Sequence, residues 1–117
     1  MTLSELYEAV GEDLNDVLER LGDPETAEHF IIAFAADPSY SQLIQNLSEN
    51  EIQSAFRASH TLKGVSLSLG LTRLGNVSGA VCENLRAGIS PPDSLLKQLE
   101  TEYCGVIAAI NNFKKCN

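Results

Sequence analysis

The sequence predicts an all-α fold, an antiparallel up-and-down four-helix bundle with one or more additional short helices at the N-terminus. Apolar residues recur at spacings of three and four, which is typical of one face of a helix. Helix-starting and helix-ending residues bracket these stretches, and no alternating run rich in Val, Ile and Thr has the pattern of a strand. The 117 residues are expected to form one domain, with an N-terminal cap over about residues 1–22 and the bundle over about 23–115.

The N-terminal cap begins with a capping box, in which Thr2 caps the first helix and the Glu5 side chain reaches back. Apolar residues then follow at alternating spacings as far as residue 21. Gly11 is expected to divide this segment into two short helices, and Gly22 is expected to end it.

The first bundle helix is expected to begin at Pro24, behind an Asp23 cap. Its apolar face consists of Phe30, Ile31 and Phe34. The pair Asp37–Pro38 should end or kink this helix, because proline lacks an N–H and disfavours helical backbone before it. Beyond that pair the helical pattern continues to about residue 47.

Three further helices complete the expected bundle. A capping box at 48–51 predicts a helix over 49–69, which Gly70 should end in the left-handed conformation. The next helix is expected over 72–87. The letters SPPD, residues 90–93, open the last helix, in which apolar side chains alternate at three and four. These are Leu96, Leu99, Tyr103, Val106, Ile110 and Phe113. They predict a seam for the bundle core, with dimerisation as the alternative.

Composition and charge argue against several classes of function. The net charge of −8 argues against nucleic acid as a partner. The longest strongly apolar run, residues 30–36, is too short to cross a membrane, and the acidic N-terminus has no signal-peptide core. A soluble, cytoplasmic protein without a membrane partner is expected. The widely spaced Cys82, Cys104 and Cys116 indicate reduced structural thiols and no zinc site, with a redox role as the alternative.

The charge is unevenly spread along the chain. Between Ile52 and Pro92 stand four basic residues and one acid, so this segment carries +3 and the rest of the chain carries −11. A basic patch on an acidic protein indicates an anionic ligand or an acidic partner surface. A chance gap among the acids is the alternative.

His60 lies in the middle of the expected helix over 49–69. At about 100° per residue, its side chain points roughly 130° away from the core face of that helix. The residues that share its side of the helix are Gln53, Phe56, Arg57, Lys63, Gly64 and Leu67. An apolar patch rimmed by positive charge predicts a docking surface for an acidic partner.

Gly64 follows His60 by one turn on the same side of the helix. Glycine costs a helix interior roughly 1 kcal/mol relative to alanine, so some benefit should compensate. We expect the missing side chain to let another molecule approach the imidazole. Tight packing inside the bundle is the alternative.

A stripe of four residues runs along the next helix at spacings of four, three and four: Gly75, Gly79, Cys82 and Arg86. It could flank the helix that carries His60, so that Arg86 brings a second positive charge to the imidazole. Gly79, Cys82 and Arg86 are therefore expected to take part in partner binding, together with Gln53, Phe56, Arg57 and Leu67. Close helix packing at the glycines, with Arg86 merely solvated, is the other interpretation.

An exposed neutral imidazole is a good nucleophile and can accept a phosphoryl group, which Lys63 at i+3 is placed to contact. A metal site is not expected, because no histidine, cysteine or carboxylate stands three or four residues from His60. The chain has neither a nucleophile elbow nor a glycine-rich phosphate loop, so hydrolase activity and ATP binding are not expected.

The letters SHTLKGVSLSLG, residues 59–70, resemble the signature of histidine-containing phosphotransfer (HPt) domains, in which a histidine is followed by x-Leu-Lys-Gly and then Leu-Gly. The residues that match in register are His60, Leu62, Lys63, Gly64, Leu69 and Gly70. The stretches 17–34 and 71–88 are similar to the N-terminal helices of that family and to the helix after the signature, so the resemblance covers nearly the whole chain.

The resemblance implies an antiparallel four-helix bundle in which His60 is the phosphoacceptor, Lys63 contacts the phosphoryl group and Gly64 leaves room for the partner. The protein would be a phosphorelay intermediate without enzymatic turnover of its own. Its partners would be a response-regulator receiver domain, which carries the Mg²⁺ and the acceptor aspartate, and a hybrid sensor histidine kinase. This chain itself would bind no cofactor.

The chain also departs from the family pattern. Many members have a glutamine where Cys82 stands, and Val65 and Leu67 are bulkier than the residues common after the Lys-Gly pair. One alternative function is a binding module that sequesters a receiver or kinase without being phosphorylated. Another, an acid–base enzyme, needs a carboxylate beside His60, which the helical wheel does not supply.

Overall fold

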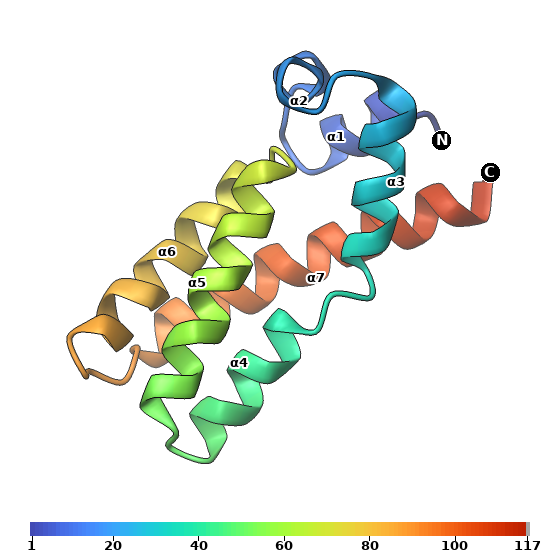
Figure 1. The fold of residues 1–117 in the computed structure, drawn as a ribbon. Coiled ribbons are helices and arrows are strands. Elements are labelled where there is room, and N and C mark those ends of the chain that lie inside the picture. The colour runs from blue at the N-terminus through green and yellow to red at the C-terminus, as the bar shows by residue number, and fades with distance from the viewer. Residues whose placement is uncertain (117) are drawn as a thin grey trace.

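The computed structural model describes residues 1–116 and is all-helical within them, which confirms the all-α prediction. The helices are α1 (Leu3–Ala9), α2 (Leu14–Leu21), α3 (Pro24–Phe34), α4 (Ser39–Ser48), α5 (Ile52–Ser68), α6 (Thr72–Arg86) and α7 (Asp93–Cys116). Figure 1 shows α5 and α6 as an antiparallel pair, with α7 crossing behind them and α1 and α2 gathered at one end. Each of the seven helices contributes buried side chains to one apolar core.

The first bundle helix is in fact two helices, α3 and α4, separated at residues 35–38 as the Asp37–Pro38 pair predicts. The Asp37 carboxylate accepts a hydrogen bond from the N–H of Ser39, at 2.8 Å, and so caps the start of α4. The predicted caps of α1 and α3 are also present, because Thr2 and Glu5 form the capping box and Asp23 caps Thr26.

The capping box predicted at 48–51 is wrong. Ser48 is the last residue of α4, and its hydroxyl donates to the carbonyl of Gln45 at 2.7 Å. Asn50 takes a left-handed backbone with φ of 59° and makes the turn, so α5 begins only at Ile52, without a side-chain cap. Asparagine adopts left-handed backbone more readily than most residues, because its short polar side chain can hydrogen-bond to nearby backbone. The chain therefore turns at Asn50, and α5 begins after the turn.

The N-terminal cap is tied to the end of the α5–α6 pair. The buried hydroxyl of Tyr7 in α1 donates to the carbonyl of Leu69 at 2.9 Å. The carboxylate of Glu12 accepts hydrogen bonds from the N–H groups of Thr72 and Arg73 at the start of α6. These contacts satisfy backbone groups that a helix terminus leaves open, and they hold the α5–α6 turn in place.

The predicted seam of α7 faces the core of its own chain. Leu99, Val106, Ile110 and Phe113 are buried, and the ring of Tyr103 stacks on that of Tyr40 with centroids 3.9 Å apart. No helix within residues 1–116 combines the length and the apolar character needed to cross a membrane.

Candidate functional site

Helix α5 presents His60 to solvent at about its midpoint. The opposite side of the helix is buried in the core through Ala55, Ala58, Ser59, Leu62 and Ser66, and the imidazole is exposed. This placement confirms the direction that the helical wheel predicts for His60. The exposed imidazole is therefore carried by a helix whose other face is fixed by packing.

Phe56 flanks the imidazole, and Arg86 of α6 lies over the Phe56 ring. The ring of Phe56, one turn earlier on α5, lies 24° from parallel to the imidazole with centroids 6.1 Å apart. The guanidinium carbon of Arg86 lies 5.2 Å from the centroid of the Phe56 ring, within cation–π range. Arg86 also pairs with Glu83 on its own helix at 3.3 Å. Arg86 is thus positioned over the ring beside His60, and its side chain is also exposed and paired with Glu83.

Gly64 faces open space. A Cβ atom built at this position would meet no neighbouring heavy atom within 4 Å. Tight packing inside the bundle is therefore excluded as the reason for this glycine. The open surface one turn after His60 leaves the imidazole accessible to another molecule.

The glycines of the α6 stripe pack against α5. A Cβ at Gly75 would clash with the side chain of Leu67, and a Cβ at Gly79 would lie 3.4 Å from the Cδ of Lys63. Both α5 side chains are consequently half-buried. The prediction that the stripe flanks the His60 helix is confirmed at these two positions.

Cys82 requires a correction. The sequence placed it among the partner-binding residues, but its side chain is only 1% exposed. Gly75 of the same stripe is buried as well, so packing covers part of this side of α6. The thiol belongs to the interior and cannot touch a partner. The other residues of the predicted surface keep some or all of their exposure; they are Gln53, Phe56, Arg57, Lys63, Gly64, Leu67, Gly79 and Arg86.

A groove that the sequence did not predict opens on the other side of His60, between α3 and α5. It has a volume of about 600 Å³. The residues that line it are Leu21, Phe30, Ala33, Phe34, Asp37, His60, Thr61, Gly64, Val65, Ser68 and Leu69. Most of this lining is apolar. His60 and Gly64 therefore border an apolar groove.

Phe30 shows why the groove was missed. The sequence assigns it to the buried face of its helix together with Ile31 and Phe34, but its side chain is 47% exposed. The run of apolar residues over 30–36 does not show which of them enter the core and which line a groove. The sign of a groove in the sequence is that this helix carries more apolar residues than one buried face needs.

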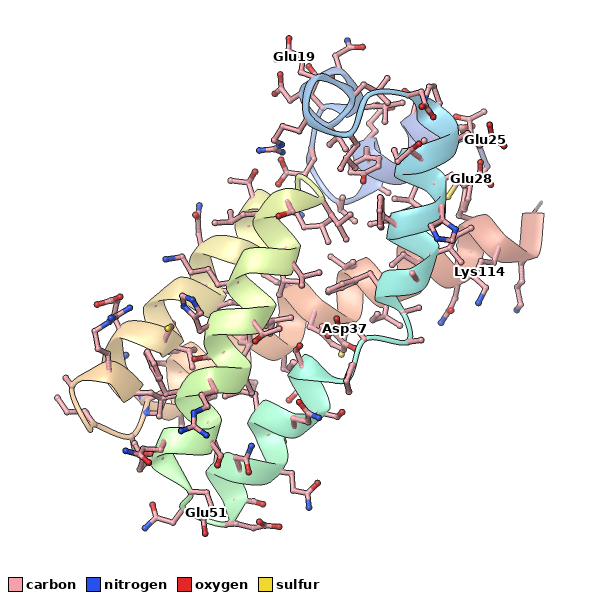
Figure 2. The ribbon with its side chains drawn as sticks, in the orientation of Figure 1. Glu19, Glu25, Glu28, Asp37, Glu51 and Lys114 are labelled. Atoms are coloured by element: carbon pink, nitrogen blue, oxygen red, sulfur yellow. The ribbon has the colours of Figure 1, made fainter. Side chains whose placement is uncertain are left out.

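Most of the acidic side chains labelled in Figure 2 lie away from this surface. Figure 2 shows Glu19, Glu25 and Glu28 around α2 and α3 at one end of the molecule, and Glu51 at the other end, between α4 and α5. Only Asp37 among the labelled acids lines the groove. Within residues 1–116 there is no group of three or more His, Cys, Asp or Glu side chains that could hold a metal ion.

Comparison with known proteins supports the same interpretation. The family model for the Hpt domain matches residues 35–109, which is more than half of the chain. A search of curated proteins and a search of solved structures each gave no match. The matched residues include α5 with its exposed histidine and the glycine-bearing face of α6. The chain therefore belongs to the Hpt domain family, whose domains transfer phosphoryl groups in two-component signalling.

Proposed function

We propose that this protein is a phosphorelay intermediate in which His60 takes a phosphoryl group from, or gives it to, an aspartate of a response-regulator receiver domain. The observation that carries the proposal is the exposed imidazole in the middle of α5, beside an open surface at Gly64. A phosphoryl donor is bulky and must approach the attacking nitrogen in line. The site offers that approach.

The chemistry requires little of this chain. Nε2 of the neutral imidazole attacks the phosphorus of an aspartyl phosphate, so a P–N bond forms as the P–O bond breaks. The aspartate leaves as a carboxylate, while Nδ1 keeps its proton. The product is a phosphorylated imidazolium, and no base is needed on this protein. The reverse step regenerates the free imidazole.

Positive charge near His60 stabilises the transferred group. Lys63 at i+3 is the cation placed to contact the phosphoryl oxygens, and Arg57 and Arg86 add to the local field. In this proposal Mg²⁺ is bound by the receiver domain, and this chain binds neither a metal ion nor ATP. ATP is used upstream, by a hybrid sensor histidine kinase, and the relay operates in the cytoplasm.

The receiver would dock across His60 on two kinds of surface. The apolar groove between α3 and α5 offers Phe30 and Val65 to apolar side chains of the partner. The basic patch, which we define as Arg57, Lys63 and Arg86, faces the acidic phosphorylation site of the receiver. Apolar contacts would supply affinity, and the charges would orient the encounter.

His60→Gln tests this function against the sequestering alternative. The substitution removes the nucleophile and keeps a polar side chain of similar reach at an exposed position, so the fold should survive. A relay predicts that the variant binds the receiver as the wild type does and accepts no phosphoryl group. A sequestering module predicts that the wild type binds without being labelled, and that the variant inhibits the receiver equally well.

A further inference from the structure

The side chain of Lys63 lies in a notch of helix α6 formed by the missing side chain of Gly79. From the position of a Cβ atom built at Gly79, the Cδ, Cε and Cγ atoms of Lys63 lie at 3.4, 3.5 and 3.9 Å. Three consecutive carbons of the lysine thus run past one glycine. No other glycine of the described chain has a lysine as its neighbour.

The ammonium group of Lys63 is available for an anion. Among residues 1–116, Lys63 takes part neither in the ion pair of Arg86 with Glu83 nor in that of Arg73 with Glu102. Its aliphatic carbons are partly covered and its charge is unpaired. A long lysine side chain carries much rotamer entropy, and packing of its carbons reduces the entropy lost when the charged end binds a ligand.

We propose that Gly79 is a positioning residue for phosphotransfer, and that it acts through Lys63 by holding the ammonium group where the phosphoryl group on His60 will be. This inference rests on the proposed function and deepens it. It assigns to Gly79 a role on this protein, distinct from the contact with a partner that the sequence suggested. A larger side chain at 79 would push the lysine carbons out of the notch.

The test variant is Gly79→Val. Valine is held largely to one χ1 rotamer in a helix, so its two methyl groups cannot both turn away from Lys63. The matched control is Gly105→Val on α7, where a Cβ would meet nothing within 4 Å. Both changes exchange a helical glycine for valine and alter helix propensity alike. Gly79→Ala is the conservative variant, because its Cβ makes only ordinary contact with the lysine.

The donor should be potassium phosphoramidate, which phosphorylates imidazole without a protein partner. Its zwitterion releases ammonia as its P–N bond breaks and a new P–N bond forms at Nε2 of His60. We expect Gly79→Val to slow this reaction about tenfold, and we expect the same of Lys63→Ala, because each removes a charge-assisted contact with the phosphoryl oxygens. Gly105→Val should leave the rate unchanged, and alanine at 79 should restore most of the rate lost with valine.

The double variant that combines Gly79→Val with Lys63→Ala tests whether Gly79 acts through Lys63. If Gly79 acts through Lys63, Gly79→Val causes no further loss when Lys63→Ala is already present. A loss that persists in full, or a wild-type rate for Gly79→Val, overturns the proposal. A nuclear Overhauser contact between the Gly79 Hα and the Lys63 methylene protons checks the geometry without phosphate, and its absence also overturns it. If wild-type His60 is never phosphorylated while this contact is seen, the proposed function fails, and the positioning role fails with it.

Discussion

The ring of Phe56 lies one turn before the imidazole of His60 on α5, with the two rings 24° from parallel and 6.1 Å apart. Arg86 covers the same ring from α6. The Phe56 ring therefore has both a cation and the proposed nucleophile as neighbours.

Phe56→Ala should lower the rate at which phosphoramidate phosphorylates His60, because the imidazole loses a neighbour that restricts its rotamers. An aromatic pair is worth about 0.5–1.5 kcal/mol beyond its buried area, so we expect a decrease of about two- to tenfold. The rate is measured with the donor in excess, and circular dichroism verifies that the helices are retained. An unchanged rate would show that the ring does not orient the imidazole.

Phe30→Asp should weaken docking of a receiver domain. The substitution places a charge in the apolar groove beside His60, and we expect the Kd to rise at least about tenfold, as for loss of a well-buried anchor. Ile44→Asp is the matched control, because Ile44 is also an exposed apolar residue, at 39%, and lies outside the groove. Calorimetric titration with one receiver compares them, and equal effects from both variants would exclude the groove as the docking site.

Tyr7→Phe should destabilise the protein by about 1 kcal/mol, the usual net value of one hydrogen bond, because the Leu69 carbonyl loses its donor. The comparison is made by urea unfolding at pH 7, with the slope of each transition verified to be equal. Equal midpoints for the two proteins would mean that the hydroxyl does not tie the N-terminal cap to α5.

Tyr7 also makes the free energy of unfolding depend on pH. Burial raises the pKa of Tyr7 to about 12, above its ordinary value of 10.0. In the unfolded chain the phenol loses its proton near pH 10, while the folded protein still holds it, so stability must fall between about pH 10 and 12. Tyr7→Phe removes this part of the decrease. If wild type and variant lose stability in parallel over that range, Tyr7 does not cause it.

Gly70→Ala should cost more stability than Gly88→Ala. Both glycines have left-handed backbone, with φ of 76° and 75°, so alanine is strained equally at each. A Cβ at Gly70 would also clash with Val17 of α2, whereas a Cβ at Gly88 would meet nothing within 4 Å. We expect an excess of about 1–3 kcal/mol for Gly70→Ala from this overpacking. Thermal unfolding of the two variants measures it, and equal losses would contradict the close approach of α2.

Much of the fold follows from local signals that depend on few residues. The caps at Thr2 and Asp23 and the break at Asp37–Pro38 are set by side chains that bond their own backbone, so the sequence predicts them well. The capping box predicted at 48–51 is absent because other local structures form at these residues. Asn50 makes a left-handed turn, and Ser48 bonds back to its own helix.

The candidate site also has features that the sequence predicts and features that it does not. The direction of His60 depends only on helical periodicity, and the open surface at Gly64 follows from its place on the same side. The groove depends on how α3 is placed relative to α5, which tertiary packing sets and residue spacing does not. Cys82 was misplaced because spacing puts the four residues of the stripe on one side of α6 but does not say how much of that side is covered. Gly75 and Cys82 are both buried there, whereas Arg86 is exposed.

Phosphotransfer from a labelled receiver domain tests the central claim most directly. Wild type, His60→Ala and His29→Ala should be incubated with the phosphorylated receiver, and the labelled product exposed to acid. His29 is the other histidine and is also exposed, so it controls for non-specific labelling. The account predicts label on wild type and His29→Ala that acid removes, as a P–N bond requires, and none on His60→Ala. Acid-stable label, or label that persists on His60→Ala, would contradict it.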